Sequence, residues 1–307
     1  MNPPLFEKED FEQWKPFLEE NGYVVIKYVL SREEINHALH LFYKDWNYVS
    51  PNFDFDDPTT WTTDNSPMMW GKGMAYTSGF GQCDFQWYLR TRDNIINIWK
   101  HVHNTEQLVV SFDGFSVFLS HKQKPKNWLH VDQANSEKTY SIQGAYNFNP
   151  VSEYDAGFVV VPKSHKTFKT EHSKKTNFIR IDENDPHTEK AVKLLIPGNC
   201  FVLWNSKTIH ANAGITSRGK KYNSIPYINR ITSYITYFPK EMRSDEIYKK
   251  RLDGYKNGDN CSHWSIYHHV KKHPFGLKKR YENRNFNRIQ PVLDENENIP
   301  KDRFDLI

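Results

Sequence analysis

The sequence predicts a mainly β protein, a sandwich or barrel with α-helices around it, on three observations. From about residue 106 onward, short runs of β-branched and aromatic residues recur between turn residues, which is typical of antiparallel sandwiches and barrels. The part before residue 105 instead shows the periodicity of amphipathic helices. Aromatic residues form 15% of the 307 residues, so rings can fill a core in a chain with 25% charged residues.

Two helices and a strand are predicted at the start of the chain. Apolar positions recur through residues 5–20, and Asn21-Gly22 is typical of a helix C-terminus. A strand is predicted over residues 23–28. Ser31 then precedes two glutamates and an amphipathic pattern, so it should cap the N-terminus of the second helix.

A long loop and the strands of the core are predicted next. Residues 50–81 are rich in Pro, Asp, Thr and Gly, which predicts an ordered loop of the kind that often carries function. A helix is predicted over residues 92–103. The strands are expected at residues 114–120, 128–133, 140–148, 157–162, 200–204, 207–211 and 231–238.

We expect one domain spanning residues 1–307. Within it, residues 1–105 should be mainly helical and include an active-site loop, and residues 106–240 should form the β core. Residues 241–307 are expected to be a helical and then irregular extension.

The charge balance is too small to imply a polyanion partner by itself. Lys and Arg number 41 against 37 Asp and Glu, a formal net charge of +4. The basic run from Lys271 to Arg280 is interpreted as a solvated face, so nucleic acid is not expected as a partner.

Cysteine usage and hydropathy favour a cytoplasmic protein without a membrane partner. Cys83, Cys200 and Cys261 are odd in number and far apart, which argues against a disulfide framework and fits a reducing compartment. The N-terminus has no secretory pattern, and no apolar run reaches the length that spans a bilayer.

The segment around His130 and Asp132 predicts two ligands of one metal ion. Alternate side chains of a strand share a face, so an imidazole and a carboxylate two residues apart can reach the same cation. The alternative is a surface His beside an Asp, because a chain with 14 His can contain this spacing by chance.

His210 is the candidate for the third ligand. It lies after a predicted strand and turn, where a second strand could bring it beside the first pair. Two His and one carboxylate form a facial triad, which leaves coordination positions of iron(II) open for a cosubstrate and dioxygen.

Several segments of the chain follow one family pattern in order across about residues 20–240. They are Gly79–Arg90, Leu108–Gly114, the His130 and Asp132 segment, Gln143–Asn147, Gly157–His165, Pro197–His210 and Arg230–Pro239. Together they resemble the phytanoyl-CoA dioxygenase family, and chance explains their common order poorly.

The resemblance implies a double-stranded β-helix (a jelly-roll or cupin-like core) and a non-haem iron(II) dioxygenase. It implies 2-oxoglutarate as cosubstrate, dioxygen as oxidant, and hydroxylation of a small organic substrate with release of succinate and carbon dioxide. His130, Asp132 and His210 would then be both the metal ligands and the catalytic centre. Related halogenases carry a small residue in place of the carboxylate, so Asp132 indicates hydroxylation.

The resemblance also implies a basic residue that binds the far carboxylate of 2-oxoglutarate. Arg230 is at the matching position, and a planar guanidinium can offer a carboxylate two parallel hydrogen bonds. Arg218 is the alternative because it is nearer to His210 in sequence, but its Ser-Arg-Gly-Lys surroundings are typical of an exposed turn.

Four further residues are predicted to contact the cosubstrate. Gln143 and Asn147 alternate on a strand and can face the interior of the barrel, or else water at its edge. Asn212 is two residues beyond His210 and can point the same way, although a turn asparagine is equally consistent. Trp204 is interpreted as a cosubstrate wall or as an ordinary core residue.

Substrate contacts are predicted at Trp87 and Arg90, which with the loop over residues 50–81 could shape the entrance. The alternative for this pair is a buried aromatic beside a structural cation. Two other functions stay open: an inactive binding protein of the same fold, and a metal-dependent hydrolase with the same ligands. The sequence predicts neither the substrate nor the oligomeric state.

Overall fold

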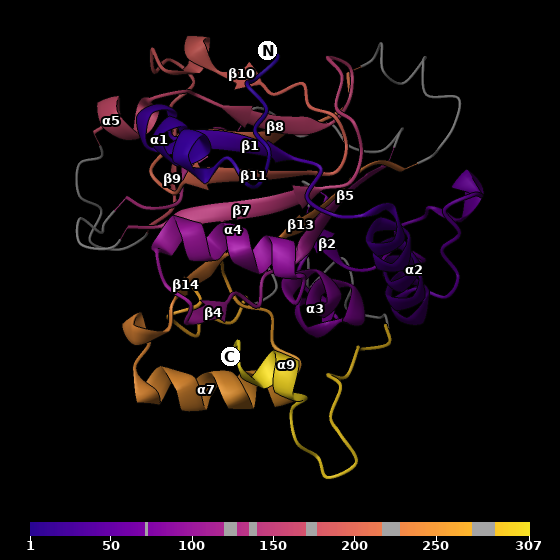
Figure 1. The fold of residues 1–307 in the computed structure, drawn as a ribbon. Helices are drawn as coiled ribbons and strands as arrows, with labels where there is room; N and C mark the ends of the chain where they lie inside the picture. The colour runs from indigo at the N-terminus through magenta and orange to yellow at the C-terminus, as the bar shows by residue number, and fades with distance from the viewer. Residues whose placement is uncertain (71–72, 120–127, 135–139, 170–176, 217–227, 272–285) are drawn as a thin grey trace. The chain divides into compact units, whose positions relative to one another are not determined.

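Antiparallel strands dominate the first of the two units that the computed structural model contains (Figure 1). The structure describes residues 1–307 except 71–72, 120–127, 135–139, 170–176, 217–227 and 272–285. Unit 1 consists of residues 1–29 and 118–232, and unit 2 of residues 30–117 and 233–307. The single domain expected from the sequence stays a prediction.

Two antiparallel sheets form unit 1. The part of the first sheet that belongs to unit 1 has the strand order β1-β11-β7-β13, with the last residues of β13 in unit 2, and the second sheet has the order β10-β8-β12-β6-β9. Figure 1 shows β1, β11 and β7 side by side, as their residue pairing requires. The strands are β1 (Tyr23–Lys27), β6 (His130–Val131), β7 (Ile142–Asn147), β8 (Gly157–Val160), β9 (Ile179–Arg180), β10 (Val192–Lys193), β11 (Cys200–Asn205), β12 (His210–Ala213) and β13 (Ile228–Tyr234).

The two sheets pack face to face and build the core of unit 1. Trp204 on β11 lies against Phe158 on β8, with ring centroids 4.8 Å apart. Arg230 on β13 donates a hydrogen bond to Asn212 on β12. Because alternate residues of a strand share a face, the inner face of the first sheet is lined from β7, β11 and β13. This arrangement is the double-stranded β-helix that the resemblance implied.

A helix and its glycine cap tie the N-terminus to unit 1. Helix α1 (Phe11–Asn21) ends where Gly22 adopts φ +77° and donates its backbone N–H to the carbonyl of Leu18. The helix packs against β1. The short elements of this unit are α5 (Ser164–Thr167) and the 3-10 turn Thr188–Lys190.

Helices and aromatic side chains dominate unit 2. Ser31 caps α2, as the sequence predicted, and it also forms a capping box with Glu34. The segment after α2 contributes Phe53, Phe55 and Trp61 to the buried core, which explains why it is ordered. The helices of unit 2 are α2 (Arg32–Val49), α3 (Asp84–Arg90), α4 (Asp93–His103), α7 (Asp245–Lys256) and α9 (Lys301–Phe304). Its 3-10 turns are Pro58–Thr60, Phe80–Gln82 and Lys240–Met242. Its strands are β2 (Met69–Trp70), β3 (Met74–Ala75), β4 (Leu108–Val110), β5 (Phe115–Leu119, which ends in unit 1) and β14 (Tyr237–Pro239).

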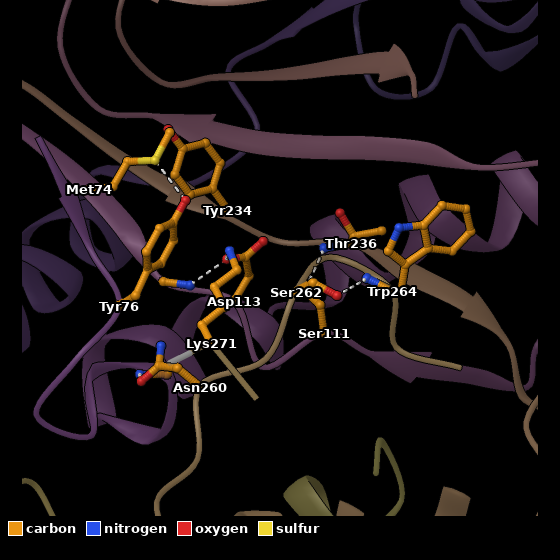
Figure 2. A network of polar contacts seen from close by, with 12 residues as sticks. Met74, Tyr76, Ser111, Asp113, Tyr234, Thr236, Asn260, Ser262, Trp264 and Lys271 are labelled. Carbon is orange, nitrogen blue, oxygen red and sulfur yellow. Dashed lines mark hydrogen bonds and ion pairs between the residues drawn. The ribbon is translucent and has the colours of Figure 1, made fainter. Parts of the chain in front are cut away.

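Polar contacts hold the C-terminal segment within unit 2 (Figure 2). The ammonium of Lys271 lies 2.7 Å from Asp113 Oδ1 and 3.6 Å from the centre of the Tyr76 ring. Asn260 accepts a hydrogen bond from the backbone N–H of Gly81. Lys271, the first residue of the predicted basic face, is therefore an internal ion-pair partner, and residues 272–280 of that run lie outside the described residues.

Several predicted boundaries differ from the structure. The strand predicted over 128–133 is confined to β6, and the strand predicted over 207–211 begins only at His210. The run over 231–238 belongs to two strands, β13 and β14. The predicted loop over 50–81 contains the short strands β2 and β3, and helix α3 was not predicted. Within the described part of the chain, no helix has the length and apolar character needed to cross a membrane.

Candidate metal centre

Two imidazoles and one carboxylate converge at the inner face of the second sheet. His130 on β6 and His210 on β12 are direct partners in the antiparallel register. Oδ2 of Asp132, just after β6, lies 3.7 Å from His130 Nε2 and 3.3 Å from His210 Nε2. One ligand atom from each of the three residues falls within 4.8 Å of the others, so the convergence predicted from the sequence is present.

Both imidazoles are held in the tautomer that metal binding requires. Nδ1 of His130 donates to the carbonyl of Trp128 at 3.0 Å, and Nδ1 of His210 donates to the carbonyl of Thr208 at 2.9 Å. Each carbonyl belongs to the residue two positions earlier. A hydrogen on Nδ1 leaves the lone pair on Nε2, and Nε2 is the atom that each ring turns toward Asp132.

The electrostatics of the cluster favour deprotonated ligands. Burial lowers the pKa of His130 below its ordinary value, and the nearby His210 lowers it further. Burial would raise the pKa of Asp132, but attraction to His130 and His210 outweighs it and holds that pKa well below its usual range. A neutral imidazole and an ionised carboxylate are the forms that bind a cation.

The donor set fits a divalent transition metal. Two imidazole nitrogens and one carboxylate oxygen suit iron(II), and they leave coordination positions for other ligands. Among the described residues, these three are the only group of three or more His, Cys, Asp or Glu side chains close enough to share an ion.

Gln143 contacts the ligand carboxylate. Its Nε2 donates to Oδ2 of Asp132 at 3.0 Å from the facing sheet. The predicted inward direction of Gln143 is present, and the contact it makes is with Asp132. An amide donor at this oxygen fixes the carboxylate between the two imidazoles.

Arg230 is buried and oriented by two asparagines. It is 2% exposed, its Nε donates to Asn147 Oδ1 at 2.7 Å and its Nη1 donates to Asn212 Oδ1 at 2.8 Å. Thr232 also donates to Asn147 Oδ1 at 3.1 Å. The structure thus brings three predicted cosubstrate residues together, while Arg218 lies outside the described residues.

Trp87 and Arg90 are core residues of unit 2. Arg90 is fully buried and donates to the carbonyls of Gly81 and Asp113 at 2.6 and 2.8 Å. Its guanidinium lies 5.1 Å from the centre of the Trp87 ring. These contacts favour the structural alternative for the pair, and their role in substrate binding stays a prediction.

Two aromatic residues beside His130 were not predicted as site residues. Trp128 stacks on the imidazole with ring centroids 4.2 Å apart, and Phe178 contacts it at 4.9 Å while remaining 45% exposed. Trp128 precedes His130 by two residues, so the alternation of side chains along a strand places both residues on the same face. No local pattern marks Phe178, because its contact depends on the pairing of β9 with β6.

Gly22 supports the turn that carries the carbonyl partner of His210. The Gly22 carbonyl accepts hydrogen bonds from Thr208 Oγ1 at 2.9 Å and from the backbone N–H of Asn205 at 3.0 Å. A Cβ at this position would lie 2.4 Å from Thr208 Oγ1 and from His165 Nδ1, at a φ that L side chains rarely adopt.

We therefore expect Gly22→Ala to lower the free energy of unfolding by about 2–4 kcal/mol, from strain and overlap together. Urea denaturation followed by circular dichroism measures the loss. The matched control is Gly258→Ala, which has a similar φ of +67°, but whose new Cβ would make only ordinary van der Waals contact, with its nearest atom, the Ile289 carbonyl oxygen, at 3.4 Å. Equal losses of unfolding free energy in the two variants would show that overlap with Thr208 and His165 does not contribute to the destabilisation.

The fold and the donor set define a double-stranded β-helix protein with a candidate two-His, one-carboxylate centre. No family model matches the chain. A curated protein, Ava biosynthesis cluster protein O from Aspergillus versicolor, is 25% identical over 224 residues, which cover 66% of this chain and 72% of that protein.

Two solved structures share the fold. The non-haem alpha-ketoglutarate-dependent carbocyclase SnoK from nogalamycin biosynthesis matches with a TM-score of 0.54 and 15% identity, over 77% of this chain and 87% of that one. The epimerase SnoN, in complex with Fe3+, alpha-ketoglutarate and nogalamycin RO, matches with a TM-score of 0.50 and 14% identity, over 76% of this chain and 85% of that one. At such identities the likeness shows the fold.

Proposed function

We propose that the protein is an iron(II)- and 2-oxoglutarate-dependent dioxygenase that hydroxylates a small organic substrate. The observation that carries the proposal is the convergence of His130, Asp132 and His210 on one point between the sheets. Arg230 supports it, because Asn212, the partner of its guanidinium, lies two residues from His210 on the same strand face. Two residues along a strand span about 7 Å, a separation that suits a short dicarboxylate held at both ends.

The similar proteins support the same class. SnoK is described as dependent on alpha-ketoglutarate, and SnoN was solved with iron and that compound. We propose membership of the phytanoyl-CoA dioxygenase family on the ordered segments of the sequence. The biosynthetic contexts of these proteins and of the Aspergillus protein favour a natural-product scaffold as the substrate.

Different residues of the chain would hold the metal, orient its ligands and bind the cosubstrate in such a reaction. An iron(II) ion held by His130, Asp132 and His210 would supply the activation of dioxygen. Gln143 holds the ligand carboxylate in place, and the asparagines at positions 147 and 212 hold the guanidinium of Arg230 for the far carboxylate of 2-oxoglutarate. Burial of the two imidazoles keeps water away from the reacting centre.

The proposal is tested by adding iron(II) and 2-oxoglutarate to the metal-free protein without oxygen. We expect a weak visible charge-transfer band, followed on admission of oxygen by succinate in the presence of a substrate from a panel of natural-product scaffolds. A protein that binds both compounds and forms no succinate with any substrate is the inactive binding protein. Metal-dependent hydrolysis without a need for 2-oxoglutarate identifies the hydrolase.

A further inference from the structure

The indole N–H of Trp204 is a buried donor beside the candidate metal centre. Trp204 is 3% exposed, and its Nε1 has no hydrogen-bond partner among the residues that the structure describes. Folded proteins pair nearly all their buried donors, because an unpaired one has lost its hydrogen bond to water without replacement. An unpaired donor beside a candidate site therefore has a hydrogen bond to offer to an acceptor that binds there.

The position of Trp204 in the first sheet directs it toward the metal ligands. Trp204 is the direct register partner of Gln143, so the two side chains share one face of the sheet. Gln143 uses that face to reach Asp132. The Trp204 ring lies 5.3 Å from the imidazole of His210.

The second tryptophan of the site gives an internal comparison. Trp128 stacks on His130 with ring centroids 4.2 Å apart, and Trp204 lies tilted beside His210 at 5.3 Å. The Trp128 Nε1 donates to the carbonyl of Asn212 at 3.1 Å, so its hydrogen bond is made within the protein. Of the two tryptophans that flank the ligand imidazoles, only Trp204 keeps its N–H available to a ligand among the described residues.

We infer that Trp204 donates a hydrogen bond from Nε1 to a carboxylate oxygen at the metal end of bound 2-oxoglutarate. The inference rests on the proposed function. Trp204 is then a positioning residue that orients the metal-bound end of the cosubstrate, while Arg230 binds the opposite end. A carboxylate is the fitting partner because a charged acceptor makes the stronger hydrogen bond with an N–H donor.

Nitrogen-15 NMR of the indole groups tests the inference without turnover. The chain has nine tryptophans, and the indole resonance missing from Trp204→Phe identifies that of Trp204. In zinc-loaded wild-type protein, we expect 2-oxoglutarate to move this proton resonance downfield and to slow its exchange with deuterium. Zinc alone should produce neither change.

Binding constants provide the second measurement. Trp204→Phe keeps an aromatic ring and loses the N–H, so we expect its dissociation constant for 2-oxoglutarate to rise roughly tenfold while zinc affinity is unchanged. The matched control is Trp46→Phe, which removes another unpaired buried indole N–H, in unit 2, and should bind 2-oxoglutarate like wild type.

The outcomes separate this inference from the function on which it rests. If zinc-loaded wild type does not bind 2-oxoglutarate, the proposed function fails. If it binds 2-oxoglutarate with an unmoved Trp204 resonance, or if Trp204→Phe binds as tightly as Trp46→Phe, only the role of Trp204 is overturned. A shift of the resonance with zinc alone and none with 2-oxoglutarate also overturns it.

Discussion

Replacing Asp132 by alanine should lower iron(II) affinity more than about 100-fold and abolish the charge-transfer band and succinate release. Loss of an outer-shell partner of a metal ligand typically costs about 10- to 100-fold in affinity, so loss of a ligand should exceed that range. Asp132 is the anionic member of the cluster, and its Oδ2 lies 3.7 Å from His130 Nε2 and 3.3 Å from His210 Nε2. Without it, two neutral imidazoles remain to hold a divalent cation.

Metal titration of the apo protein, followed by equilibrium dialysis, measures this loss. Asp132→Asn keeps the shape of the side chain and removes its charge, so its iron(II) affinity should lie between those of Asp132→Ala and wild type. Asp182→Ala changes an exposed carboxylate whose contact is with the backbone N–H of Asn184, and it should bind iron normally. Normal iron binding by Asp132→Ala, with an unchanged circular dichroism spectrum, would contradict the assignment of this cluster as the metal centre.

Elements whose ends depend on local chemistry could be predicted from the sequence. Gly22 ends α1 because only a residue at ease with positive φ can make that cap, and Ser31 starts α2 through its side-chain hydrogen bond with Glu34. The start of β12 was predicted too early. Residues 205–208 form a turn, in which the Thr208 N–H donates to the Asn205 carbonyl at 2.8 Å. Apolar residues flank this turn on both sides, so the hydrophobicity pattern does not separate it from the strand that follows.

The candidate centre was predictable as far as strand alternation reaches. The spacing of His130 and Asp132 places them together locally, whereas His210 joins them through a strand pairing 80 positions away that no local pattern dictates. For Gln143, strand alternation predicts that the side chain can face the interior, but it does not predict which residue the amide contacts. The contact with Asp132 depends on how the two sheets face each other. Phe178 was missed for the same reason, since its place beside His130 follows from long-range pairing.

Replacing Arg230 by methionine should raise the dissociation constant for 2-oxoglutarate about 100-fold and leave metal affinity near that of wild type. Methionine fills a similar volume without charge, so the far carboxylate loses its charge-assisted hydrogen bonds to a buried guanidinium. Arg230→Lys should recover only part of this loss, because an ammonium lacks the planar geometry that binds both carboxylate oxygens. Calorimetric titration of the zinc-loaded variants with 2-oxoglutarate measures these constants.

Arg218→Met is the matched control, because Arg218 is the alternative cosubstrate residue in the sequence. If Arg218→Met weakens binding and Arg230→Met does not, the two roles are exchanged and the metal assignment still stands. The structure favours Arg230 on physical grounds. Its guanidinium is 2% exposed and held by two neutral amide oxygens, at 2.7 and 2.8 Å. Burial and the two amide partners hold the guanidinium in one orientation, and the cost of its desolvation was already incurred when the protein folded, so a dicarboxylate that binds beside Arg230 meets an oriented cation.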